Sequence, residues 1–307
     1  MSNTLLALSH KAELGLHARV VADVQAMAAP LGIALLITGA FARDLHLHYA
    51  WGVPVQRQTT DVDFALAVND WATFERLRNQ LVHSGRFEQA QGLPHRLRHG
   101  GGLPIDLVPF GAIETGQRQI AWPPAGDVVM DVFGFREALA AAANVALPQG
   151  VQAAVVSLPA LAWLKIVCWQ DRHHRSPGKD AQDLQQILNH YLDTGHEARL
   201  WGECLSWTQE DGFDYLLAGA RMLGRDIAKQ LDTKALERVS AIIAQQVRTE
   251  QPGILPGQMN PRSPEQAAMQ LQALLRGMNE TSAPCTPPPT PSSRSSGTTA
   301  TCCATTA

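Results

Sequence analysis

Two aspartates one residue apart, Asp61 and Asp63, begin an apolar run that ends at Val68. The run is typical of a β-strand, in which residues i and i+2 point to the same face, so we expect the two carboxylates to project side by side. Like charges this close are unfavourable unless a cation lies between them. Mg²⁺ takes one or two carboxylates together with substrate phosphate oxygens. The spacing therefore predicts a Mg²⁺ site, with Mn²⁺ as the alternative ion.

A third acid, Asp106, lies in a second apolar run, Leu103 to Phe110. Residues that favour strands flank it on both sides, so we expect it in a sheet and not in a solvated loop. A single Asp at a strand end is usually a cap or a turn residue. The ordered combination of three acids favours the metal site, with Asp61, Asp63 and Asp106 as its ligands.

A candidate phosphate site precedes the acids. Residues 33–38 are typical of a short buried strand, and Gly39 and Ala40 follow it at the start of a helical pattern. The free N–H groups and the dipole of a helix N-terminus favour an anion. Glycine allows the backbone to approach such an anion closely. A lone Gly before a helix is nevertheless a weak signal.

Lys165 is the only charged residue in the predominantly apolar segment between Ala138 and Gln170. One interpretation is that its stem covers apolar surface while the ammonium stays in water. The other is that the ammonium reaches an anion in a cleft between two domains, because a buried lysine needs a counter-charge. Asp180 and Asp183, three residues apart, would share one face of a helix that begins near residue 179.

The segment from Arg172 to Lys179 adds a local group of cations, Arg172, Arg175 and Lys179, together with two histidines. These residues could form ordinary surface or contact a phosphate backbone. For the histidines we favour the surface interpretation.

The order of patterns predicts an α+β fold with two domains and a tail. We expect a sheet-bearing domain over residues 1–150, a helical domain over 151–280 and a disordered low-complexity tail over 281–307. The tail is rich in Thr, Ser, Pro and Ala and lacks the apolar area that would offset its ordering entropy. The expected helices and strands are 14–29, 33–38, 40–49, 61–68, 71–84 with Asp70 as its N-cap, a hairpin over 95–109, 118–121, 127–132, 134–143, 158–172, 179–192, 213–230 and 232–248.

Composition limits the environment of the chain. It has 307 residues, 45% hydrophobic and 17% charged, and a net charge of −3, which suits a globular protein without a general attraction to polyanions. The apolar stretch 138–170 is broken by Pro148, Gly150 and Pro159, so we expect buried elements and no membrane contact. The five cysteines show no metal-ligand spacing, and no secretory signal opens the chain. A reducing cytoplasm fits best.

These motifs together resemble the nucleotidyltransferases of the DNA polymerase β superfamily, and most closely the AbiEii/AbiGii toxin family. The matching segments are Ile37-Thr-Gly39-Ala40, Thr59-Thr-Asp61-Val-Asp63-Phe, Ile105-Asp106-Leu, and Lys165 followed by Lys179-Asp180-Ala-Gln-Asp183-Leu. They span residues 33 to about 190, and their combination is more specific than any one of them. At one position the chain departs from the family, because Ala40 offers no hydroxyl group.

The resemblance implies a polymerase-β-like domain with a mixed sheet and a Mg²⁺-dependent transfer of a nucleoside monophosphate from a triphosphate to a hydroxyl group. Asp61, Asp63 and Asp106 would hold the metal, and Gly39 and Ala40 would hold the triphosphate. Lys165 would stabilise the phosphates and Asp183 would orient Lys165 or the nucleotide. The implied acceptor is RNA, such as a tRNA 3′ end, and the implied partner is an antitoxin.

Three alternatives stay open. The acceptor could be the hydroxyl of a small molecule of the antibiotic type, the chain could be a catalytically degenerate module that binds a nucleotide without turnover, or it could be a purely structural α/β protein. Ala40 favours the second alternative, whereas the coexistence of the three acids with Lys165 opposes it. The sequence does not name the preferred base, the acceptor or the oligomeric state.

Overall fold

The computed structural model describes residues 5–55, 57, 59–247 and 253–280. Its largest feature is a mixed sheet of eight strands, with the order β1-β9-β10-β2-β3-β6-β5-β4. A separate two-stranded sheet is formed by β7 and β8. The strands are β1 Leu5–Ala7, β2 Ala34–Thr38, β3 Val62–Val68, β4 Phe87–Gln89, β5 Arg96–His99, β6 Pro104–Gly111, β7 Gln119–Ala121, β8 Val129–Asp131, β9 Ala143–Ala146 and β10 Gln152–Val155.

The centre of the sheet is formed by β2, β3 and β6. Strand β3 pairs antiparallel with β2 and parallel with β6, which makes the sheet mixed. Phe64, Ala65 and Leu66 in β3 are fully buried, because both faces of this central strand are covered. Continuous apolar sequence is the expected pattern for such a strand.

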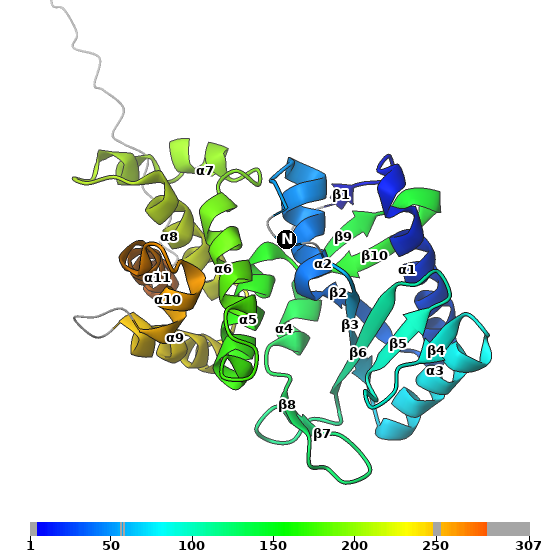
Figure 1. Ribbon diagram of the computed structural model, residues 1–307. Coiled ribbons are helices and arrows are strands. Elements are labelled where there is room, and N and C mark those ends of the chain that lie inside the picture. Colours follow the sequence, from blue (N-terminus) through cyan, green and yellow to red (C-terminus); the bar gives the residue numbers. More distant parts are fainter. Residues whose placement is uncertain (1–4, 56, 58, 248–252, 281–307) are drawn as a thin grey trace, which may run out of the picture.

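Helices cover the sheet and form a second half of the molecule (Figure 1). Helices α1 and α3 lie beside the sheet at the right of Figure 1, whereas the helices from α5 onward gather at the left. The α-helices are α1 Gly15–Ala28, α2 Gly39–Asp44, α3 Trp71–His83, α4 Phe135–Ala140, α5 Leu158–Arg172, α6 Lys179–His190, α7 Glu197–Trp201, α8 Tyr215–Ala228, α9 Thr233–Val247, α10 Ile254–Met259 and α11 Pro264–Asn279.

Shorter turns complete the chain. A π-helix over Leu45–Ala50, η3, continues α2 directly. The 3₁₀ turns are η1 Ala12–Leu14, η2 Ala29–Leu31, η4 Pro148–Gly150 and η5 Leu205–Gln209.

The expected α+β class is confirmed, and most of the expected elements occur within a few residues of their expected bounds. The expected N-cap is also present, since the Asp70 carboxylate accepts a hydrogen bond of 2.6 Å from the Thr73 N–H. The helix expected over 40–49 is α-helical only to Asp44 and then becomes η3. The helix expected over 134–143 ends at Ala140.

Several elements were not expected. Strand β10 pairs with β2 and β9, so the sheet continues past residue 150 to Val155. The division into domains at residue 150 stays a prediction, and the tail expected over 281–307 lies outside the described residues. Helix α11 was missed as well. It packs so closely on α8 that a Cβ atom at Gly277 would lie 1.9 Å from the Arg221 carbonyl oxygen.

Within the described residues, no helix is long and apolar enough to cross a membrane. The apolar stretch 138–170 instead forms the end of α4, strands β9 and β10, and most of α5. Helix α5 is buried along nearly its whole length, which accounts for its apolar sequence.

Candidate active site

The three predicted acids meet at one end of the central strands β3 and β6. In the strand register, Asp63 lies opposite Thr38 of β2 on one side and opposite Asp106 of β6 on the other. Side chains that are paired across neighbouring strands point to the same face of the sheet. Asp61 precedes Asp63 by two residues and therefore follows the same direction. The structure thus brings Asp61, Asp63 and Asp106 together.

A cation that the sequence analysis did not single out joins two of these acids. Arg96 of β5 is paired with Asp106 in the sheet register. Its Nε and Nη2 atoms lie 2.7 and 2.6 Å from the two Asp106 carboxylate oxygens, and Nη2 also lies 2.9 Å from Asp61 Oδ2. This fork-to-fork geometry is the strong form of an Arg–carboxylate pair. Asp61 and Asp106 therefore share the single positive charge of one guanidinium.

Asp63 is held on its other side by the backbone of α2. Gly39, the first residue of α2, has φ +70°, and a Cβ atom at this position would lie 1.8 Å from Asp63 Oδ2. Only glycine fits, because a side chain would both strain the backbone and occupy the space of the carboxylate. The adjacent Ala40 is buried. The strand-to-helix turn is therefore built directly against the acid.

The predicted lysine is buried in a second charged cluster. Lys165 of α5 is 5% exposed, and its Nζ lies 3.1 Å from Asp180 Oδ1 and 2.6 Å from Asp183 Oδ2 of α6. The interpretation in which the ammonium reaches water is therefore wrong. Burial alone would lower the pKa of Lys165, but the carboxylates of Asp183 and Asp180 raise it above its usual value. Helix α6 begins at Lys179 and places both acids on one face, as expected.

Two arginines complete the lysine cluster. Arg43 of α2 is 2% exposed and donates hydrogen bonds to Asp183 and to Asp44. Arg172 of α5 donates from Nε and Nη2 to the two oxygens of Asp180, at 2.8 Å each. Burial opposes ionisation of Asp180, yet Lys165 and Arg172 hold its pKa well below the usual range. This network fixes α2, α5 and α6 relative to one another.

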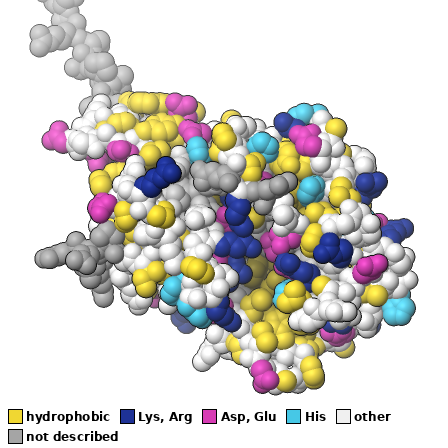
Figure 2. All heavy atoms as spheres, viewed as in Figure 1, with side chains coloured by type: hydrophobic (Ala, Val, Ile, Leu, Met, Phe, Trp, Pro, Cys, Tyr) yellow, Lys and Arg dark blue, Asp and Glu magenta, His cyan; other side chains and the backbone are white. Residues whose placement is uncertain are grey.

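The acids and the helical cations act on each other across a hollow. Burial and the neighbouring charges of Asp106 and Asp61 raise the pKa of Asp63 to about 6, while Lys165 and Lys179 act in the opposite direction. Figure 2 shows a hollow between the two halves of the molecule, with Lys and Arg side chains along one wall and Asp, Glu and further basic side chains on the other. The site is thus a cleft between sheet and helices.

The three acids suit a hard divalent cation by their chemistry. All their donor atoms are carboxylate oxygens, the ligands that Mg²⁺ prefers. The raised pKa of Asp63 also marks it as the acid without a direct basic partner. Within the described part of the chain, however, no group of three or more His, Cys, Asp or Glu residues is arranged to hold a metal. The assignment of Asp61, Asp63 and Asp106 as metal ligands stays a prediction.

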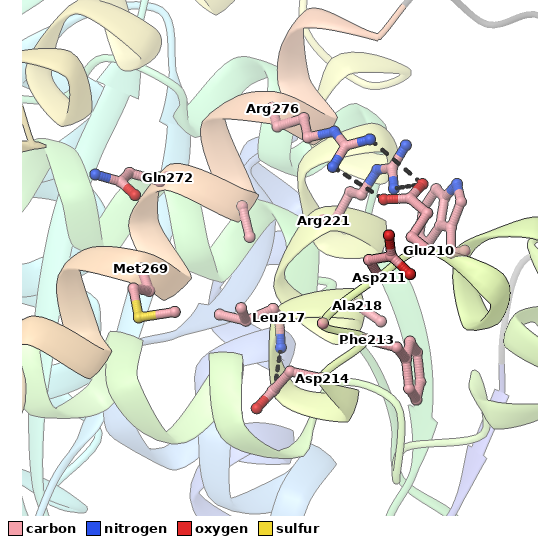
Figure 3. Close-up of a pocket in the computed structure, with 13 residues that line it drawn as sticks. Glu210, Asp211, Phe213, Asp214, Leu217, Ala218, Arg221, Met269, Gln272 and Arg276 are labelled. Carbon is pink, nitrogen blue, oxygen red and sulfur yellow. Dashed lines mark hydrogen bonds and ion pairs between the residues drawn. The ribbon is translucent and has the colours of Figure 1, made fainter.

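Two further hollows lie outside this cleft. One lies in the helical half between α8 and α11, where Arg221 and Arg276 both pair with Glu210 at 2.8 and 3.2 Å (Figure 3). Its charged groups thus compensate one another. The other, of about 1090 Å³, lies between β1, the η3 π-helix and the ends of α6 and α8, and His46 and His196 are among its lining residues. Neither hollow is lined by any of the three acids.

Comparison with known proteins agrees with this architecture. The family model described as nucleotidyl transferase AbiEii toxin, Type IV TA system, matches residues 23–271. That range includes the acids, Arg96, Lys165 and most of the helical half. No curated protein sequence matches the chain.

Solved structures with detectable similarity are distant. The antibiotic-resistance factor ANT(2″)-Ia, in complex with adenylyl-2″-tobramycin, is 14% identical with a TM-score of 0.36 and covers 60% of this chain and 98% of its own. An antigenic nucleotidyltransferase-like protein from Paracoccidioides brasiliensis is 20% identical with a TM-score of 0.36, covering 62% of this chain and 89% of its own. The Thermotoga maritima CCA-adding enzyme complexed with tRNA is 12% identical, with a TM-score of 0.22 and coverage of 88% and 79%.

Replacement of Gly39 by alanine tests the contact between α2 and Asp63. The added Cβ falls on the carboxylate, so we expect Gly39→Ala to lower the free energy of unfolding by about 1–3 kcal/mol more than a matched control. The control is Gly32→Ala, at φ +67°, where nothing lies within 4 Å of the added Cβ. Urea denaturation of both variants provides the measurement, and equal losses would show that the contact with Asp63 is unimportant.

The raised pKa of Asp63 predicts a pH dependence of stability without metal. The folded pKa of about 6 exceeds the usual 3.8, so the native state retains the proton longer than the unfolded chain. Stability from this group is complete below about pH 3.8 and is lost as the pH rises through about 6, to a total of about 3 kcal/mol at most. In EDTA, wild-type protein should lose this increment relative to Asp63→Asn between pH 4 and pH 7. Parallel pH profiles for the two proteins would contradict the prediction.

Proposed function

The chain belongs to the AbiEii family of nucleotidyltransferases, and from this premise we propose that it transfers a nucleoside monophosphate from a triphosphate to a hydroxyl group of RNA. We further propose that the reaction requires Mg²⁺ and that the protein acts as the toxin of a toxin–antitoxin pair, with a tRNA 3′ end as the acceptor and an antitoxin protein as its partner. The observation that carries the proposal is the convergence of Asp61, Asp63 and Asp106 at the ends of the central strands, beside the Gly39 turn.

In the proposed reaction the acceptor hydroxyl oxygen forms a bond to the α-phosphorus, and the bond from that phosphorus to the bridging oxygen breaks. Pyrophosphate leaves with the bonding electron pair. Asp61 and Asp63 would hold Mg²⁺, which neutralises charge on the triphosphate and the leaving pyrophosphate. Asp106 would help to activate the acceptor hydroxyl once its oxygens are released from Arg96, either by binding a second ion or by taking the proton as a general base. The backbone of Gly39 and Ala40 lies next to Asp63 and receives the phosphates.

Lys165 contributes through its charge in this proposal. Its ammonium is bonded to Asp180 and Asp183 and does not point freely into the cleft. Its charge nevertheless reaches the acids, because Lys165 counteracts the raised pKa of Asp63. We assign Lys165 to stabilising the bound phosphates electrostatically and Asp183 to holding Lys165 in position. Arg43, buried against Asp183, supports the same arrangement.

The charge of the cleft supports a polyanionic acceptor. Arg172 is 39% exposed on its side chain and acts electrostatically on Asp63, as does the exposed Lys179. Arg57, 41% exposed on its side chain, lies 3.3 Å from Asp183, and Arg175 lies in the turn that follows α5. Exposed cations near the reacting groups are suited to the phosphate backbone of RNA. The net charge of −3 provides no such attraction elsewhere.

The proposed function can be tested by incubating purified protein with each α-³²P-labelled triphosphate, Mg²⁺ and total RNA. We expect labelled RNA with wild-type protein and none in EDTA. Asp63→Asn should lower the rate by on the order of 10³-fold, because a metal-bridging carboxylate contributes several kcal/mol to the barrier. Asp127→Asn is the matched control. Because Asp127 is exposed, this variant should transfer nucleotide at the wild-type rate.

Other outcomes of this experiment refute parts of the proposal separately. Nucleotide transfer by Asp63→Asn at the wild-type rate would refute the assignment of Asp63 to the active site. Pyrophosphate release that depends on a small hydroxylated molecule, with no labelled RNA, would replace the RNA acceptor by a small-molecule one. Nucleotide binding without pyrophosphate release would show a degenerate module.

A further inference from the structure

Arg96 occupies the position between two of the acids to which a metal would bind. One of its nitrogens, Nη2, contacts Asp61 Oδ2 at 2.9 Å and Asp106 Oδ2 at 2.6 Å, while its Nε binds the other Asp106 oxygen. Two strands that are neighbours in the sheet thus offer their acids to one guanidinium. Of these oxygens, that of Asp61 belongs to an acid that would hold the divalent cation in the proposed function, and those of Asp106 belong to the acid that would activate the acceptor hydroxyl.

The pair is fixed by the sheet and is not a chance contact at the surface. Arg96 and Asp106 are direct partners in the antiparallel pairing of β5 and β6. The next basic residue on the same face of β5, Arg98, lies opposite Pro104 and donates only to the Gly102 carbonyl oxygen, at 3.3 Å. Position 96 is therefore the place on β5 from which a cation meets the acids.

Arg96 can leave this position more easily than Arg43, the buried arginine of α2, can leave its own. Its side chain is 32% exposed, whereas that of Arg43 is 2% exposed and bonded to Asp44 and Asp183. Movement of the partly exposed Arg96 side chain into solvent breaks its ion pairs with Asp61 and Asp106 but does not require the guanidinium to lose hydration. Withdrawal of Arg43 would remove a buried counter-charge from Asp44 and Asp183, although Lys165 and Arg57 would still pair with Asp183.

We propose that Arg96 is a resident counter-cation of the Asp61–Asp106 pair that competes with the divalent cation and gives way when metal and triphosphate arrive together. This inference rests on the proposed function, because it assumes that the acids bind metal. Arg96 holds the acids close while no metal is present, and the triphosphate becomes its counter-ion after displacement. Nucleotide-free protein therefore binds a divalent cation weakly, and metal and nucleotide binding are coupled.

The test measures Mn²⁺ binding to the full chain by electron paramagnetic resonance, with and without a non-hydrolysable triphosphate. Without nucleotide, Arg96→Gln should bind Mn²⁺ on the order of tenfold more tightly than wild type, because a charge-assisted competitor has been removed. The triphosphate should strengthen Mn²⁺ binding more in wild type than in Arg96→Gln. Arg98→Gln is the matched control and should resemble wild type in both measurements.

Arg96→Lys provides a second variant should Arg96→Gln fold poorly, as judged by circular dichroism in EDTA. It retains the charge but not the fork, so its Mn²⁺ affinity should lie between those of wild type and Arg96→Gln. Equal or weaker Mn²⁺ binding after loss of the arginine would overturn the inference. If wild type transfers nucleotide normally in that case, only the role of Arg96 fails. If no protein binds Mn²⁺ even with triphosphate, the metal site and the inference fail together.

Discussion

Three carboxylates on neighbouring strands must share one small region, and their mutual repulsion is the constraint on which the site depends. Asp61 and Asp106 share the single positive charge of Arg96. Asp63 is buried, is repelled by these two acids and is compensated only by the more distant charges of Lys165 and Lys179. Such an arrangement is unfavourable for stability, and it is retained in this fold only with compensating cations nearby. In the proposed function, the same feature would make the site receptive to a divalent ion and to the phosphates that accompany it.

The two halves of the molecule contribute the two kinds of charged group in the site. The sheet supplies the acids in register and the Gly39 turn that confines Asp63. The helices supply the cations, and a network around Asp183 holds Lys165 of α5 and Arg43 of α2 in fixed positions. Because α2 begins at the Gly39 turn and also carries Arg43, it connects that turn with the lysine cluster. Removing one partner from such a buried network leaves another charge uncompensated, so the cluster acts as a unit.

The sequence predicted the acids, the Gly39 turn and the helical lysine because each lies in a local pattern of strand or helix. It predicted the hairpin over 95–109 but did not single out Arg96. The importance of Arg96 depends on its position opposite Asp106 in that hairpin. Pairing of opposite charges across the two strands could have identified it. Arg43 was missed because its partner Asp183 is distant in sequence. Strand β10 and helix α11 were missed because they depend on tertiary packing against β2 and α8. The local periodicity of hydrophobic residues does not reveal such packing.

The central claim is that Asp61 and Asp63 share one divalent cation during nucleotide transfer, with Asp106 beside it. A crystal structure with Mn²⁺ and a non-hydrolysable triphosphate tests it most directly, because the anomalous signal of manganese locates the ion independently of the model of the protein. We expect a manganese peak at about 2.0–2.3 Å from carboxylate oxygens of Asp61 and Asp63 and from phosphate oxygens, with Arg96 moved away from Asp61. A triphosphate bound elsewhere, or a manganese peak without contact to Asp63, would contradict the account.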